Sequence, residues 1–207
     1  MTISSDIDIC ARALLRLGEK PISSFSDGTD PATTCANIYP ELKQMILTVH
    51  PWRRTMKKMA LSTLSATPAN KWTKKYQLPS DRMGEIQAVY NTTSTGPGIQ
   101  PITTFELFGD ELFTDEATIV VDYQKEIAEA EFPHYLSELM ILALTAEIAF
   151  PITDQANLAE LYDAKAWGLP GHQRQGGYFA VCKSLDSRGS APDVVVGDID
   201  LILARQG

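Results

Sequence analysis

Two pairs of neighbouring acids are the residues best suited to catalysis in this sequence. Asp110 adjoins Glu111, and Asp115 adjoins Glu116. Glycoside cleavage needs two carboxyl groups about 5–9.5 Å apart across a substrate cleft. Adjacent residues on a strand or loop point to opposite sides, so the simpler interpretation is a solvated acidic surface. We therefore expect no enzyme and keep a glycan hydrolase as the weaker alternative.

The histidines and cysteines are few and scattered: His50, His134, His172, Cys10, Cys35 and Cys182. No histidine has a nucleophile at a spacing that indicates catalysis. The cysteines are odd in number and lack the spacing of paired cysteines. The cysteines therefore read as small core residues. The glycines of 168–177 form neither a Walker pattern nor GxGxxG. We expect no catalytic residue, no metal and no cofactor.

Charge is unevenly distributed along the chain. Nine of its 18 Lys and Arg residues lie between Lys43 and Arg82 with one acid, whereas Glu106 to Glu131 holds nine acids and one lysine. Surfaces of opposite sign steer association, and a cyclic oligomer uses two different faces of each subunit. The alternative is two ordinary solvated faces. The predicted subunit interface joins Arg53, Arg54, Lys57 and Lys58 to Asp110, Glu111, Asp115 and Glu116 of a neighbour.

The stretch 52–76 also mixes cations with aromatic residues, as proteins that bind single-stranded nucleic acid do. A nucleic-acid-binding module is therefore a further alternative. The sequence pI of about 4.9 and the lack of a helix-turn-helix or zinc signature oppose it. Trp52, Trp72 and Tyr76 read first as core aromatics where helix meets strand, and second as interface anchors.

Helical periodicity and capping signals mark both ends of the chain. Ser5 followed by Asp8 resembles a capping box, and Asp30 before Pro31 is a second helix start, with a kink expected at Pro40. Apolar residues nearly encircle 131–150, which predicts a central helix. Glu147 departs from that pattern, as a stray exposed acid or as a contact across a subunit boundary. Asp154 should cap the last helix.

The middle of the chain has a period near two and clusters of turn residues. We expect antiparallel strands at 59–63, 72–78, 85–90, 102–108 and 117–126. The predicted fold class is α+β: a bundle of about four helices (1–58 and 128–169), an inserted β domain (59–127) and an extended C-terminal tail (170–207). We expect no apolar run that approaches the roughly 20 residues needed to span a bilayer, and no signal peptide at the start.

An ordered series of short motifs resembles a known family. It comprises Leu17 to Phe25, His50-Pro51-Trp52-Arg53-Arg54, Ala60-Leu61 and Trp72 to Arg82. This series is similar to that of the tail tubular protein A family, the head-to-tail adaptor or gatekeeper proteins of bacteriophages. The resemblance covers roughly 5–168 and fades after Pro170.

The resemblance implies a structural virion protein without enzyme activity, assembled in the bacterial cytoplasm. It implies a ring of about twelve subunits between the portal protein and the tail nozzle protein. Genomic double-stranded DNA would pass through the lumen without specific binding, and no membrane is involved. Separately, the strand-like pattern at its end leads us to expect that the tail docks on the portal or a neighbouring subunit, by strand addition to an exposed edge. Its docking residues would be Ile199, Leu201, Ile202 and Leu203.

Overall fold

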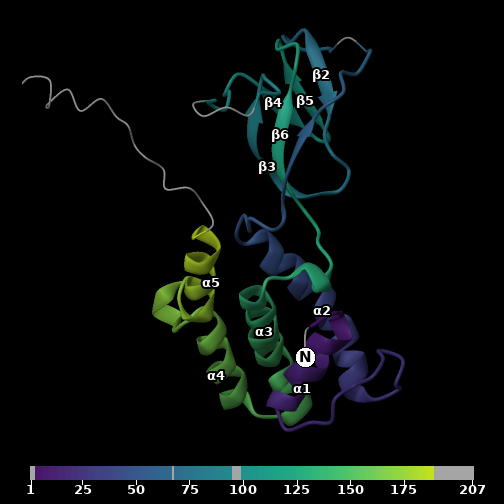
Figure 1. Cartoon of the computed structure of the whole chain (residues 1–207). Coiled ribbons are helices and arrows are strands. Elements are labelled where there is room, and N and C mark those ends of the chain that lie inside the picture. The colour runs from purple at the N-terminus through teal and green to yellow at the C-terminus, as the bar shows by residue number, and fades with distance from the viewer. Residues whose placement is uncertain (1–2, 67, 95–98, 189–207) are drawn as a thin grey trace, which may run out of the picture.

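The structure is a computed structural model that describes residues 3–66, 68–94 and 99–188. In this part of the chain it is a mixed α+β structure with five α-helices and two small antiparallel sheets. Figure 1 shows the strands at one end of the molecule and the helices at the other, joined by two chain segments. The helices are α1 (Asp6–Arg16), α2 (Asp30–Thr48), α3 (His134–Thr153), α4 (Ala156–Trp167) and α5 (Gly177–Ser187). We call them the helical region.

The strands form what we call the β region. They are β1 (Met56–Ala60), β2 (Lys74–Gln77), β3 (Arg82–Tyr90), β4 (Glu106–Phe108), β5 (Glu111–Thr114) and β6 (Val120–Lys125). The sheet orders are β1-β6-β3 and β2-β5-β4, all antiparallel. The expected pairing direction is confirmed, but β1 begins before the predicted start and β5 was not predicted. Side chains of both sheets, from Tyr76 to Tyr123, form one apolar cluster.

Local signals set the starts of the first two helices. The Ser5 Oγ accepts a hydrogen bond from the Asp8 N–H at 3.1 Å, which confirms the predicted cap of α1. Thr29 rather than Asp30 caps α2, through a hydrogen bond from the Ala32 N–H at 3.4 Å. Asp30 is instead the first residue of the helix. Pro40 lies inside α2 without ending it, as its resumed periodicity predicted.

The helix α3 forms the centre of the helical region. Twelve of its 20 residues are buried, and it contacts α1, α2, α4 and α5. In length and composition it could cross a membrane, so the expectation that no apolar run approaches that length is wrong. Yet 67% of its most apolar window is buried inside the protein, which is what the core helix of a folded domain also shows. The predicted central position is confirmed.

The expectation of an extended chain from Pro170 onward is wrong for the residues that the structure describes. Pro170–His172 forms a 3-10 turn, and α5 follows and packs on α4 and α3. Its buried residues Phe179 and Cys182 join the helical core. This makes one more helix than predicted. The predicted docking residues Ile199, Leu201, Ile202 and Leu203 lie outside the described residues.

Gly177 allows α5 to begin against the end of α4. Its φ is +56°, and an added Cβ would lie 2.5 Å from the Gly168 backbone nitrogen and 2.8 Å from the Lys165 carbonyl oxygen. Both neighbours are backbone atoms, which cannot move aside as a flexible side chain would. The start of α5 therefore requires glycine.

We predict that Gly177→Ala lowers the free energy of unfolding by about 1–3 kcal/mol, because the new side chain meets both backbone strain and a clash. Urea denaturation followed by circular dichroism measures the change. Gly171→Ala is the matched control, since a Cβ there has no atom within 4 Å. Equal stability of the two variants would contradict the assignment.

Candidate functional site

The positive and negative stretches of the sequence meet within the folded chain. Five cations of the stretch 43–82 form salt bridges with acids of the stretch 106–131, and Lys57 pairs with Asp81. Antiparallel pairing of β1 with β6, and of β2 with β5, places the two stretches side by side. The five cations and their partners are Lys43 with Glu126 and Glu129, Lys58 with Asp122, Lys71 with Glu106, Lys75 with Glu111, and Arg82 with Asp110.

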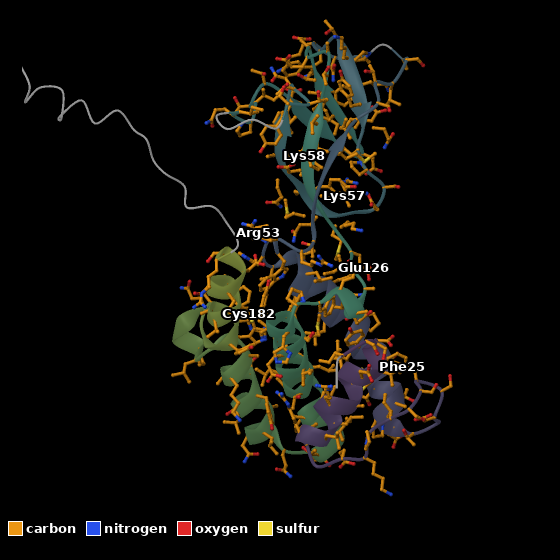
Figure 2. All side chains as sticks on the ribbon, in the orientation of Figure 1. Phe25, Arg53, Lys57, Lys58, Glu126 and Cys182 are labelled. Atoms are coloured by element: carbon orange, nitrogen blue, oxygen red, sulfur yellow. The ribbon has the colours of Figure 1, made fainter. Side chains whose placement is uncertain are left out.

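The lysines of the predicted interface pair with acids other than the predicted ones: Lys57 with Asp81 and Lys58 with Asp122. Lys57 and Lys58 extend from β1, and Lys58 also lies over the Tyr90 ring at 3.8 Å (Figure 2). Arg53 lies at the junction between the two regions, and its backbone N–H donates to Asp186 of α5 at 3.2 Å. Exposed Arg54 follows it. Contacts between these cations and acids of a neighbouring copy stay a prediction.

The four predicted acidic residues accept hydrogen bonds from different parts of the β region. Asp110 accepts from Arg82 of β3 at 2.9 Å, whereas Glu111 accepts from Lys75 of β2 at 2.9 Å. Asp115 accepts from the N–H and hydroxyl of Thr73, both at 2.9 Å, and the Glu116 backbone carbonyl accepts from the Tyr76 hydroxyl. A pair of catalytic carboxylates has to face one cleft. Adjacent Asp110 and Glu111 instead turn toward different strands.

A hollow of about 360 Å³ beside β5 is lined by Lys75, Phe108, Glu111 and Phe113 together with residues 68–70. It holds one carboxylate, which is already bound to a lysine. Among the residues that the structure describes, no group of three or more His, Cys, Asp or Glu side chains is placed to hold a metal ion. The geometry therefore gives the glycan hydrolase alternative no paired acids at this hollow.

The aromatic residues of the stretch 52–76 are mostly inside the protein. Trp52 is fully buried, and its indole N–H donates to the Ile46 carbonyl at 2.7 Å. Tyr76 is buried in the β cluster, and the Trp72 indole donates to Glu106 at 2.9 Å. The interpretation of Trp52 and Tyr76 as core aromatics is confirmed. Neither ring offers a face on which a base could stack.

The cysteines are core residues, as predicted. Cys10, Cys35 and Cys182 are all buried in the helical core. Burial raises the pKa of the Cys182 thiol to about 12, and its Sγ lies 3.4 Å from the Tyr135 carbonyl oxygen. A thiol held in this protonated form is a poor nucleophile.

Sequence reasoning missed a buried carboxylate where the helical and β regions join. Asp186, in the last turn of α5, is 6% exposed. Its two oxygens accept from the Tyr135 hydroxyl at 2.7 Å and the Arg53 N–H at 3.2 Å, and His50 Nε2 lies 3.6 Å away. One side chain thus joins α5, the start of α3 and the segment that enters β1. The only signal for it in the sequence was that Asp186 follows Phe179 and Cys182 at helical spacing, on the same face of the helix.

Two further polar side chains, Gln124 and Glu129, stabilise the other connection between the regions, which runs from β6 to α3. The buried amide of Gln124, at the end of β6, lies within 3.0 Å of the carbonyls of Leu47 and His50. Glu129 accepts from the Tyr39 hydroxyl at 2.9 Å and pairs with Lys43. Burial opposes ionisation of Glu129, but the hydrogen bonds from Lys43, the backbone and Tyr39, together with the charge of Lys43, outweigh burial and lower the pKa. The segment that returns from β6 to the helical region is therefore tied to α2.

No model of a known protein family matches the chain, and a search of curated proteins finds no relative.

We predict that Asp186→Ala lowers the free energy of unfolding by about 1–3 kcal/mol, because it leaves the Tyr135 hydroxyl and the Arg53 N–H without their acceptor. Chemical denaturation measures this loss. Asp163→Ala is the matched control: its pair with Arg174 is exposed and 3.4 Å long, so its removal should cost little. A similar small change in both variants would show that Asp186 does not fasten the junction.

We predict that His50 makes stability depend on pH. Burial lowers its pKa, and Lys183 adds to this effect while Asp186 opposes it. The unfolded chain therefore takes up the proton first, so stability is complete above the ordinary pKa of about 6.5 and falls as the pH drops below it. Melting temperatures between about pH 7.5 and 5 should decline less steeply in His50→Gln. His134→Gln, at an exposed position, should keep the wild-type slope.

Proposed function

We propose that this chain is a structural head-to-tail adaptor of a bacteriophage virion. It would form a ring of about twelve copies between the portal and the tail nozzle and conduct genomic DNA without chemistry. The proposal takes the architecture as a helical bundle that carries an inserted antiparallel β domain, as the tail tubular protein A family implies. Assembly would take place in the host cytoplasm.

The observation that carries the proposal is where the resembling motifs lie. The segment 17–25 connects α1 to α2, and its Phe25 packs against the helical core (Figure 2). The segment 50–54 connects α2 to β1 through buried Trp52. The segment 72–82 contains β2 and enters β3, with Tyr76 and Leu78 in the β cluster. Each motif thus shapes a connection on which this architecture depends.

The charges of the β region suit a structural role. Four of its acids pair with lysines or an arginine of the same region, so these cations stabilise the fold rather than form a basic track for DNA. A channel for moving DNA must avoid many strong phosphate contacts, because each neutralised phosphate adds affinity. A β region with internally compensated charge meets that requirement.

The first test is the mass of the particle, measured by native mass spectrometry with and without a purified portal ring. We expect a closed ring of about twelve copies, at the latest when the portal is present. The portal alone is the control for its own mass. A chain that stays monomeric in both samples would overturn the proposal.

A further inference from the structure

Seven large apolar side chains are exposed on the described helical region; one, Leu15, lies on α1, and the other six divide between α2 with α3 and α4 with α5. Met45 and Val49 at the end of α2 and Phe150 of α3 are 36–54% exposed. Leu161 of α4, Leu169 after it and Val181 of α5 are 47–61% exposed. Figure 1 places α2 on one side of α3, and α4 and α5 on the other. Exposed apolar patches are typical of interaction sites.

The first side contains a groove with an acidic rim. A hollow of about 350 Å³ is lined by Ile38, Glu41, Leu42, Met45 and Glu147, which we call the acidic groove. The apolar residues of α2 recur at helical spacing and line one face. Glu41 and Glu147 are exposed, and neither carboxylate has a hydrogen bond or ion pair with another residue in the part of the chain that the structure describes.

The second side carries cations beside its apolar residues. We call it the basic face: Leu161, Leu169 and Val181 with Lys165 and Lys183. Arg174, between α4 and α5, is already paired with Asp163 at 3.4 Å and adds no net charge. Lys165 lies over the Tyr162 ring at 4.7 Å, and Lys183 lies over the Phe179 ring at 4.7 Å. These positions hold the ammonium groups on the surface of α4 and α5.

We propose that the acidic groove binds the basic face of a second copy of this chain. Each surface offers apolar side chains for burial, and their charges are opposite in sign. The two surfaces differ and lie on opposite sides of α3, so the contact is head to tail and leaves one free surface at each end. The chain can therefore add further copies. Closure into a ring, in contrast to the contact itself, rests on the proposed function.

The charges also decide against contacts between like surfaces. If two acidic grooves faced each other, Glu41 and Glu147 of both copies would meet without cations, and like charges across an interface are strongly unfavourable. Two basic faces would repel each other for the same reason. The acidic groove thus selects a different surface of its partner, and Glu147 lies at the subunit boundary.

Cross-linking tests the direction of this contact. Met45→Cys marks the acidic groove and Val181→Cys the basic face, while the three native cysteines are buried. With a bifunctional maleimide, a mixture of the two variants should give covalent dimers that neither variant gives alone. As the control, Phe108→Cys, exposed on β4, is mixed with either variant in place of the other. This mixture should give no covalent dimers. Dimers of one variant alone, or equal yields with the control, would overturn the proposal.

Charge reversal tests the complementarity. Glu41→Lys with Glu147→Lys makes the groove basic, and Lys165→Glu with Lys183→Glu makes the opposite face acidic. Each double variant should need an at least about tenfold higher concentration to assemble. Their mixture should assemble as wild type does, because every groove then meets a face of opposite sign when the two variants alternate. Glu85→Lys, a single charge reversal exposed on β3, is the control and should assemble normally.

The outcomes separate the interface from the function. A mixture that fails to assemble, or double variants that assemble like wild type, overturns the interface while a wild-type ring leaves the proposed function in place. A wild-type chain that is monomeric in every sample, portal included, overturns both.

Discussion

The need to cover α3 on every side governs the structure. Its apolar residues occupy the whole circumference of the helix, so no single neighbouring helix can remove them from water. The cover comes from α1 and α2, which precede the β region, and from α4 and α5, which follow α3. The chain must therefore leave the helical region and return to the same place. Antiparallel pairing of β1 with β6 meets this need, because it puts Met56 opposite Gln124 at the base of the β region.

The junction between the regions is polar, although it lies against two apolar cores. Asp186 and Gln124 are buried there, and each has several hydrogen-bond partners from different segments. Buried polar groups with all partners in place favour one arrangement over others, since any displacement leaves a group unsatisfied. The orientation of the β region on the helices thus depends on α5, the last helix before the undescribed C-terminal residues.

The arrangement of charge bears on the proposed adaptor in a way that the sequence alone did not suggest. Neighbouring strands bring the basic and acidic stretches together, and their ion pairs are used inside one subunit. Glu41 and Glu147, two charges of the helical region without an ion-pair partner among the described residues, border an apolar groove. Within the proposed ring, the helical region thus offers a better-defined contact between subunits than the paired strands do.

Short-range signals in the sequence determined most of the helices and the extent of the β region. The cap at Ser5, the apolar circumference of 134–153, the buried cysteines and the change to a period of two all depend on neighbours along the chain. The sequence also singled out Glu147, but the groove beside it exists only because α2 packs on α3. Tertiary structure alone decided the burial of Asp186, the helix α5 that carries it and the partners of the lysines. The reason is physical: the burial of a polar residue and the pairing of a charge depend on which segments become neighbours in space.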